Sequence, residues 1–135
     1  MENIGGVFGV IGLICIIYLA LRPALQAILE WHGQKGKTIP DLLKKVYQFL
    51  TKTHRYAGFI AVGAILLHFF LQYQQYGIIP VAGLIAGLFL VIQSFLGFGL
   101  TKQKDADRRK KMALLHRTLG VLIILAVLVH RIAGS

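Results

Sequence analysis

The sequence contains 135 residues, of which 56% are hydrophobic, and it carries a formal net charge of +10 at pH 7. A mean hydropathy of +0.69 is too high for an ordinary soluble protein, so the composition indicates a membrane protein with a single domain, residues 1–135. The only cysteine, Cys15, excludes a disulfide within the chain.

Apolar runs predict four transmembrane helices, at residues 4–29, 54–76, 81–101 and 112–133. Each run is close to the roughly 20 residues that cross a bilayer. The predicted fold class is therefore an all-α membrane protein, a bundle of four transmembrane helices. The segment before the first run is Met-Glu-Asn rather than basic, so we expect that run to be a helix of the mature chain and not a signal peptide.

The first helix, residues 4–29, is expected to pack closely against a neighbour. Its outer half carries three glycines: Gly5, Gly9 and Gly12. Small residues at such spacings let helices approach in lipid. Residues 30–40 are polar and are predicted to form an inner loop. We interpret His32 in this loop as an interfacial residue, with contact to a quinone, a partner or a proton path as the alternative.

Residues 41–53 have apolar and basic positions at helical spacing and are predicted to form an amphipathic extension. This extension either lies on the membrane surface or runs straight into the second helix, residues 54–76. A tight turn at 77–80 leads into the third helix, residues 81–101. The glycines of this helix indicate packing or room for a flat cofactor: Gly83, Gly87, Gly97 and Gly99. A charged loop is expected to end where the fourth helix begins, at residue 112.

Basic residues are concentrated in two stretches. Of fifteen Lys and Arg, seven lie within residues 22–55, seven within 102–117, and the last is Arg131. With four spans, both stretches fall on one side of the membrane, which the positive-inside tendency makes cytoplasmic. We therefore expect both termini outside and the second and fourth helices parallel. Topology and attraction to anionic lipid account for the charge, so no nucleic-acid partner is expected.

Four histidines repeat at matched positions inside the apolar spans. His54 and His68 are fourteen residues apart, as are His116 and His130, and the two copies are offset by 62 residues. Each copy opens with the motif His-Arg-x-x-Gly. Fourteen helical residues extend about 21 Å and turn the side chain back to within about 40° of its first direction, so both histidines of a copy share one face. Histidine inside a membrane marks a functional site by default.

The parallel direction of the two helices sets which histidines meet. His54 is predicted to face His116 at the inner level, and His68 to face His130 at the outer level. This arrangement yields two bis-histidine sites, one above the other. Four residues are expected to fill the face between the two levels: Ala61, Ile65, Ile123 and Val127.

A cofactor for these sites has to accept two opposed imidazoles. Zinc needs about four protein ligands, or three and a water, and no Cys, Asp or Glu lies at these depths. Haem b fits better, because its iron takes two axial nitrogens and its macrocycle is a large apolar disc. The sequence therefore predicts two haem b groups. Gly58 and Gly120, one turn after the inner histidines, would let such a disc approach the backbone.

Arginines follow three of the four histidines. They are Arg55, Arg117 and Arg131. Each can extend its charge to the membrane interface or pair with a haem propionate that points to the nearer surface. The two roles are compatible.

These residues resemble the haem helices of transmembrane di-haem cytochromes b, particularly the ferric reductase and NADPH oxidase membrane domain. There, each of two helices supplies two histidines thirteen or fourteen residues apart. Similar arrangements occur in the ascorbate-reducing cytochromes b of vesicle membranes and in the cytochrome b subunit of quinol-oxidising complexes. The resemblance covers only the two histidine-bearing helices, and it implies that His54, His68, His116 and His130 are axial ligands. The chain departs from those families in having four helices instead of six or more, and no Gly-rich nucleotide loop follows a strand.

The resemblance implies electron transfer across a membrane through two stacked haems, from a cytoplasmic or quinol donor to an outer acceptor. Partners would be membrane lipid and a redox donor or acceptor, such as quinol, a flavoprotein or another cytochrome, and the chain could serve a quinol- or metal-linked oxidoreductase. Two alternatives stay open. One is a small multidrug-type transporter that dimerises, although every Asp and Glu lies outside the spans. The other is a haem-bearing anchor subunit of a larger oxidoreductase.

Overall fold

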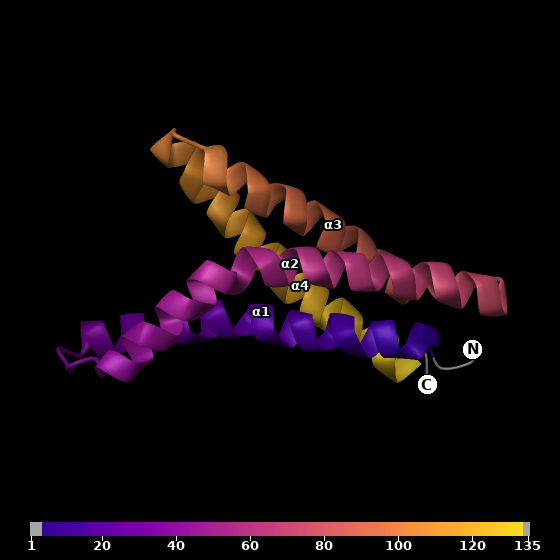
Figure 1. Ribbon diagram of the computed structural model, residues 1–135. Helices are drawn as coiled ribbons and strands as arrows, with labels where there is room; N and C mark the ends of the chain where they lie inside the picture. Colours follow the sequence, from indigo (N-terminus) through magenta and orange to yellow (C-terminus); the bar gives the residue numbers. More distant parts are fainter. Residues whose placement is uncertain (1–3, 134–135) are drawn as a thin grey trace.

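Four helices make up nearly all of the computed structural model, which describes residues 4–133 (Figure 1). They are α1 (Ile4–Gln34), α2 (Asp41–Tyr76), α3 (Val81–Lys102) and α4 (Ala106–Ala133). Each helix is long and apolar enough to cross a membrane, and the described residues contain no strand. The predicted fold class, an all-α membrane protein with four transmembrane helices, is confirmed.

The helices form two antiparallel hairpins, α1 with α2 and α3 with α4, which touch each other less extensively through α2 with α3 and α1 with α4. Loops 35–40 and 103–105 lie at one end of the structure, here called the basic end (Figure 1). Turn 77–80 and the last residues of α4 lie at the other, here called the turn end. α2 and α4 therefore run in the same direction, as predicted. Assignment of the basic end to the cytoplasm stays a prediction.

The first hairpin is longer at the basic end than the sequence indicated. α1 continues past residue 29 to Gln34, and Gly36 then adopts a φ of 63°. α2 begins at Asp41, directly after Pro40, and runs without interruption to the turn end. The amphipathic extension therefore continues into the spanning segment. Proline suits the start of a helix because its fixed φ is compatible with the first turn and its missing N–H is not needed there.

The second hairpin also has a shorter loop than predicted. α4 begins at Ala106 instead of residue 112, so only residues 103–105 connect it to α3. The Asp105 carboxylate accepts a hydrogen bond from the backbone N–H of Arg108 at 2.9 Å. This N-cap satisfies a free helix donor, which explains why the charged stretch is helical and not a loop.

The turn between α2 and α3 depends on Gly77. Its φ is 70°, in the left-handed region, and its N–H donates to the Tyr73 carbonyl at 2.8 Å. Glycine adopts this conformation without the steric cost of a Cβ, and it is the common residue after a helix end. Pro80 then precedes α3. The predicted tight turn at 77–80 is confirmed.

The outer surface of the bundle is apolar. Large apolar side chains are exposed on all four helices, among them Phe95 at 73%, and no polar or charged residue is buried among the described residues. In water such a surface would be unfavourable, whereas lipid hydrocarbon is a suitable solvent for it. This distribution agrees with a multi-pass membrane protein.

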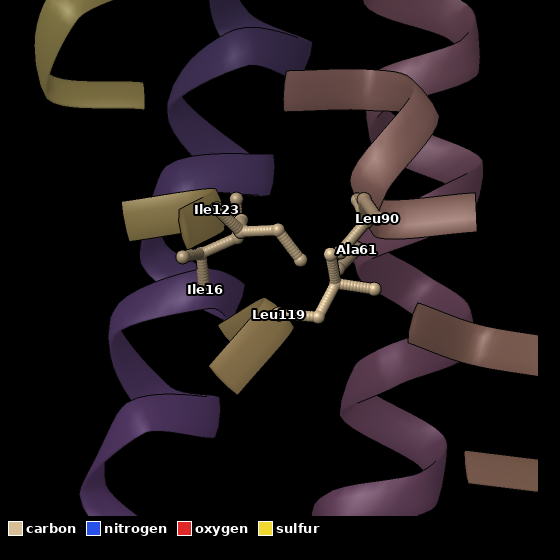
Figure 2. Close-up of a cluster of buried hydrophobic side chains, with 5 residues drawn as sticks. All are labelled: Ile16, Ala61, Leu90, Leu119 and Ile123. Carbon is tan, nitrogen blue, oxygen red and sulfur yellow. The ribbon is translucent and has the colours of Figure 1, made fainter. Parts of the chain in front are cut away.

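A layer of buried apolar side chains joins the two hairpins at mid-height (Figure 2). Ile16 comes from α1, Ala61 from α2, Leu90 from α3, and Leu119 and Ile123 from α4. Ala61 is fully buried and Ile123 is only 3% exposed. Because all four helices contribute, this layer fixes how the hairpins sit against each other.

Alanine in place of Gly87 is expected to destabilise the bundle by about 1–3 kcal/mol, the usual cost of overpacking. A Cβ at this position on α3 would overlap the ring of Phe69 on α2. Gly63→Ala is the matched control, since nothing lies within 4 Å of a Cβ there. Thermal unfolding in detergent measures both variants. Equal melting temperatures of Gly87→Ala and Gly63→Ala would contradict the close contact between Gly87 on α3 and Phe69 on α2.

Candidate functional site

The four patterned histidines come together in two pairs. The rings of His54 and His116, here called the basic-end pair, have centroids 6.3 Å apart and planes inclined by 65°. The rings of His68 and His130, here called the turn-end pair, have centroids 6.4 Å apart and planes inclined by 72°. Each pair joins α2 to α4. The predicted pairing by level is confirmed, and the crossed pairs do not form.

The helices that carry the histidines face each other diagonally across the bundle. α1 and α3 each contact both of them, whereas no Cα of α2 lies within 8 Å of a Cα of α4 in the described part of the chain. The backbones of α2 and α4 therefore stay apart, and the paired imidazoles approach each other across the space between them. Two opposed rings across such a gap are the arrangement that an axially ligated metal requires.

The spacing within each pair can be tested against a metal site. A metal–imidazole bond is about 2 Å long and the centre of the ring lies about 1 Å from each nitrogen, so two imidazoles on opposite sides of one ion have centroids about 6 Å apart. The observed separations are 6.3 and 6.4 Å. Rotation of either ring about its metal–nitrogen bond leaves this distance unchanged, so the inclined planes are compatible with the same ion. The residues present fit a bis-histidine cofactor.

His68 is held in a defined orientation by α1. Its Nδ1 lies 2.8 Å from the backbone carbonyl of Gly5, which can only accept a hydrogen bond. Nδ1 therefore donates this bond, and Nε2 is the ring nitrogen left to bind a metal. A Cβ at Gly9 would come within 3.0 Å of the same ring. The glycines of α1, predicted to serve packing, thus bring that helix against a candidate ligand.

Glycines of α3 support the two histidines of α4 in a similar way. A Cβ at Gly83 would lie 3.0 Å from Cε1 of His130, and one at Gly97 would lie 3.2 Å from Cε1 of His116. The two glycines are fourteen residues apart, the same interval as the histidines. That shared interval was visible in the sequence and could have indicated the contact. Each glycine leaves room for one imidazole.

Three of the four histidines have a nitrogen that is buried without a partner. Nδ1 of His54, His116 and His130 makes no hydrogen bond. Buried polar atoms are normally satisfied, and the cost of leaving them unpaired is higher in lipid, where no water substitutes. A cluster of such atoms in matched positions is typical of a ligand-binding site.

The apolar layer separates the two pairs evenly. Ala61 is seven residues from both His54 and His68, and Ile123 is seven residues from both His116 and His130. Ile65 and Val127, also predicted to fill this face, pack against the layer while remaining partly exposed, as does Cys15. The filling residues predicted from the sequence are confirmed. The two histidine pairs are therefore separated by a layer of buried apolar side chains.

A pocket opens beside the turn-end pair. Its lining includes His68 and His130, the supporting glycines Gly9 and Gly83, and the guanidinium-bearing Arg131. The other lining residues are mostly apolar. Of the three arginines predicted to pair with propionates, Arg131 is thus placed beside a histidine pair.

The other two predicted arginines point elsewhere. Arg55 is exposed, and its guanidinium lies 5.8 Å from the ring centroid of Phe59 and 5.7 Å from that of Phe98. Arg117 is exposed as well. For both residues the interfacial role is favoured by these positions.

The predicted glycines differ in their surroundings. A Cβ at Gly58 would meet nothing within 4 Å, whereas one at Gly120 would lie 3.3 Å from the side-chain amide of Gln93 on α3. The backbone of Gln93 also lies beside His116, and its side-chain Oε1 is buried without a partner. Gln93 therefore belongs to the surroundings of the basic-end pair. Its signal in the sequence was a lone amide within the apolar run of α3.

His32 stays apart from the paired histidines in its contacts. Its ring lies edge-on to Trp31 with centroids 5.1 Å apart, and Nδ1 is 3.0 Å from the Ile28 carbonyl. Both neighbours belong to α1. The interpretation as an interfacial residue is consistent with these contacts.

Within residues 4–133, no group of three or more His, Cys, Asp or Glu side chains is placed to hold a metal ion. A structural zinc site, which needs about four protein ligands, is therefore not formed by the described residues. Paired histidines alone suit a cofactor that brings its own equatorial ligands. Comparison of the chain with protein-family models, with curated proteins and with solved structures gives no match.

Proposed function

We propose that this chain is a membrane electron-transfer protein that binds two haem b groups. His54 and His116 would be the axial ligands of one haem, and His68 and His130 those of the other. The observation that carries the proposal is the ring separation within both pairs, 6.3 and 6.4 Å, which is the value expected for two imidazoles on opposite sides of one metal ion.

The residues around the histidines support this role by orienting them. The Gly5 carbonyl fixes the tautomer of His68, and Gly83 and Gly97 leave room for the rings of His130 and His116. Partners of this kind normally set the direction and basicity of metal-bound histidines. Bound haem would supply the reversible one-electron chemistry of iron.

The apolar layer would keep water away from the space between the two cofactors. Ala61 and Ile123 lie midway between the histidine levels, which are about 21 Å apart along each helix. Exclusion of water lowers the local polarity and limits side reactions of a reduced centre. The layer would also hold the two hairpins together. Electron transfer between the two haems would then require no movement of the helices.

We further propose that electrons enter at the basic end and leave at the turn end, as the resemblance to di-haem cytochromes b implies. The donor would be membrane quinol, a flavoprotein or another cytochrome, and the acceptor would be a molecule at the outer surface. Paired sites at both ends of a four-helix bundle suit such a path. The chain would then act alone or as the haem-bearing subunit of a larger oxidoreductase.

A reduced-minus-oxidised spectrum of the purified chain, expressed with a supply of haem, tests the proposal. We expect the bands of a low-spin b-type cytochrome and two haems per chain. A colourless protein that binds organic cations would overturn the proposal in favour of a small exporter. Two haems that no quinol or protein donor reduces would favour the anchor subunit instead.

A further inference from the structure

Arg22 on α1 is a half-buried cation near the basic-end pair. Its Nε donates to the hydroxyl of Thr51 on α2 at 3.3 Å, and its guanidinium lies 5.8 Å from the ring centroid of Tyr47. The Thr51 hydroxyl donates in turn to the Tyr47 carbonyl at 2.8 Å, so it is free to accept from Arg22. The position of the guanidinium is therefore defined by α2.

The residues that hold Arg22 share a helix face with a candidate ligand. Tyr47, Thr51 and His54 are spaced by four and three residues, the interval of neighbours on one face. One turn before Arg22, the hydroxyl of Tyr18 lies 2.5 Å from that of Thr53 and fixes the level of α1 against α2. The cation is thus held about one turn from His54, on the side of the basic end.

This cation has no carboxylate partner within the described residues. The only ion pair there joins Lys44 to Asp41, and Glu30 accepts from Gln26. The Nη groups of Arg22, the fork that matches a carboxylate, make no hydrogen bond to the described part of the chain. A half-buried guanidinium whose Nη groups are free is suited to bind an anion.

We propose that the guanidinium of Arg22, held in place by Thr51, is an anion site for the carboxylates of the cofactor held by the basic-end pair. This inference rests on the proposed function and adds a residue that the motif His-Arg-x-x-Gly does not contain. Arg22, rather than Arg55 or Arg117, is then the propionate partner at this end. A positive charge beside the haem also favours its reduced form, so Arg22 raises the midpoint potential of that haem relative to a neutral side chain.

Potentiometric titration of Arg22→Gln in detergent tests the site. We expect the variant either to lose the basic-end haem or to retain it with a lower midpoint potential, while the other haem is unchanged. The lower potential would appear as about a tenfold lower ratio of reduced to oxidised haem at a fixed ambient potential. Arg22→Lys keeps the charge and should restore the potential in part. Lys45→Gln, which removes an exposed charge from α2, is the matched control and should change neither quantity.

Haem whose propionates are methyl esters separates the possible anions. Reconstituted into the wild-type chain, the ester should raise the potential of the basic-end haem, because it removes negative charge beside the iron. It should also weaken retention of that haem as Arg22→Gln does, and the variant should add no further loss of retention. If the ester leaves haem retention unchanged while the variant responds to replacement of anionic by neutral lipid, Arg22 binds a lipid phosphate and not the propionates. Two haems with unchanged potentials in Arg22→Gln overturn this inference alone. A wild-type chain without haem overturns it together with the proposed function.

Discussion

Alanine in place of His68 or His130 is expected to lower the haem content from two to one per chain, and both substitutions should remove the same haem. The two rings form the turn-end pair, and loss of either would leave the proposed haem with only one histidine to hold it. His54→Ala and His116→Ala should remove the other haem. Haem quantification measures the stoichiometry, and the midpoint potential of the remaining haem identifies which site was lost.

His32→Ala is the matched control, because the contacts of this ring lie within α1. It should retain both haems. The double variant His68→Ala with His130→Ala should retain as much haem as either single variant, since both act on one site. Two haems in His68→Ala would exclude this residue as a ligand. Different remaining potentials in His68→Ala and His130→Ala would exclude the pairing.

Valine at Gly83 is expected to weaken retention of the turn-end haem, and valine at Gly97 that of the basic-end haem, each by about tenfold. The rings of His130 and His116 lie so close to these glycines that a Cβ alone would meet them at 3.0 and 3.2 Å. The additional methyl groups of valine would push each ring out of position. The amount of haem that stays bound after dilution measures the effect. The different midpoint potentials of the two haems show which of them is lost.

The two glycine variants serve as internal controls for each other because they act at opposite ends of α3. Gly63→Val adds the same side chain to α2 where nothing lies within 4 Å of a Cβ, and it should retain both haems. Loss of the same haem from Gly83→Val and Gly97→Val would contradict the assignment of one glycine to each site. Full retention in both would show that α3 does not position the histidines.

Local properties of the sequence were sufficient for the main architecture. Apolar length determines which segments can cross a membrane, so four helices and an all-α fold followed from the apolar runs of the sequence. Two spans lie between the two basic stretches, so both stretches fall on one side of the membrane. α2 and α4 each begin on that side and are therefore parallel. The fourteen-residue interval then placed both histidines of a helix on one face. Together these facts predicted which rings meet.

The ends of the helices were less predictable. The predicted loop between α3 and α4 extended to residue 111, but the Asp105 cap starts the last helix at Ala106. Lys and Arg are good helix formers, so a charged stretch next to a cap continues as a helix in water as readily as it forms a loop. The hydropathy pattern therefore predicts where the membrane-spanning segment ends, but it does not predict where the helix ends.

The neighbours of each histidine were decided only by tertiary structure. Nothing local to α1 indicates that Gly5 and Gly9 face His68, that Arg22 lies beside Thr51, or that Gln93 borders the basic-end pair.

In a soluble protein the apolar face of a helix reveals its orientation, whereas in lipid both the interior and the exterior are apolar and the pattern carries little information. The sequence by itself therefore determined the number and direction of the helices and the levels of the four histidines. Close packing of α1 and α3 against α2 and α4 decided the rest, because in lipid the rotation of each helix is set by contacts between small and polar residues of different segments.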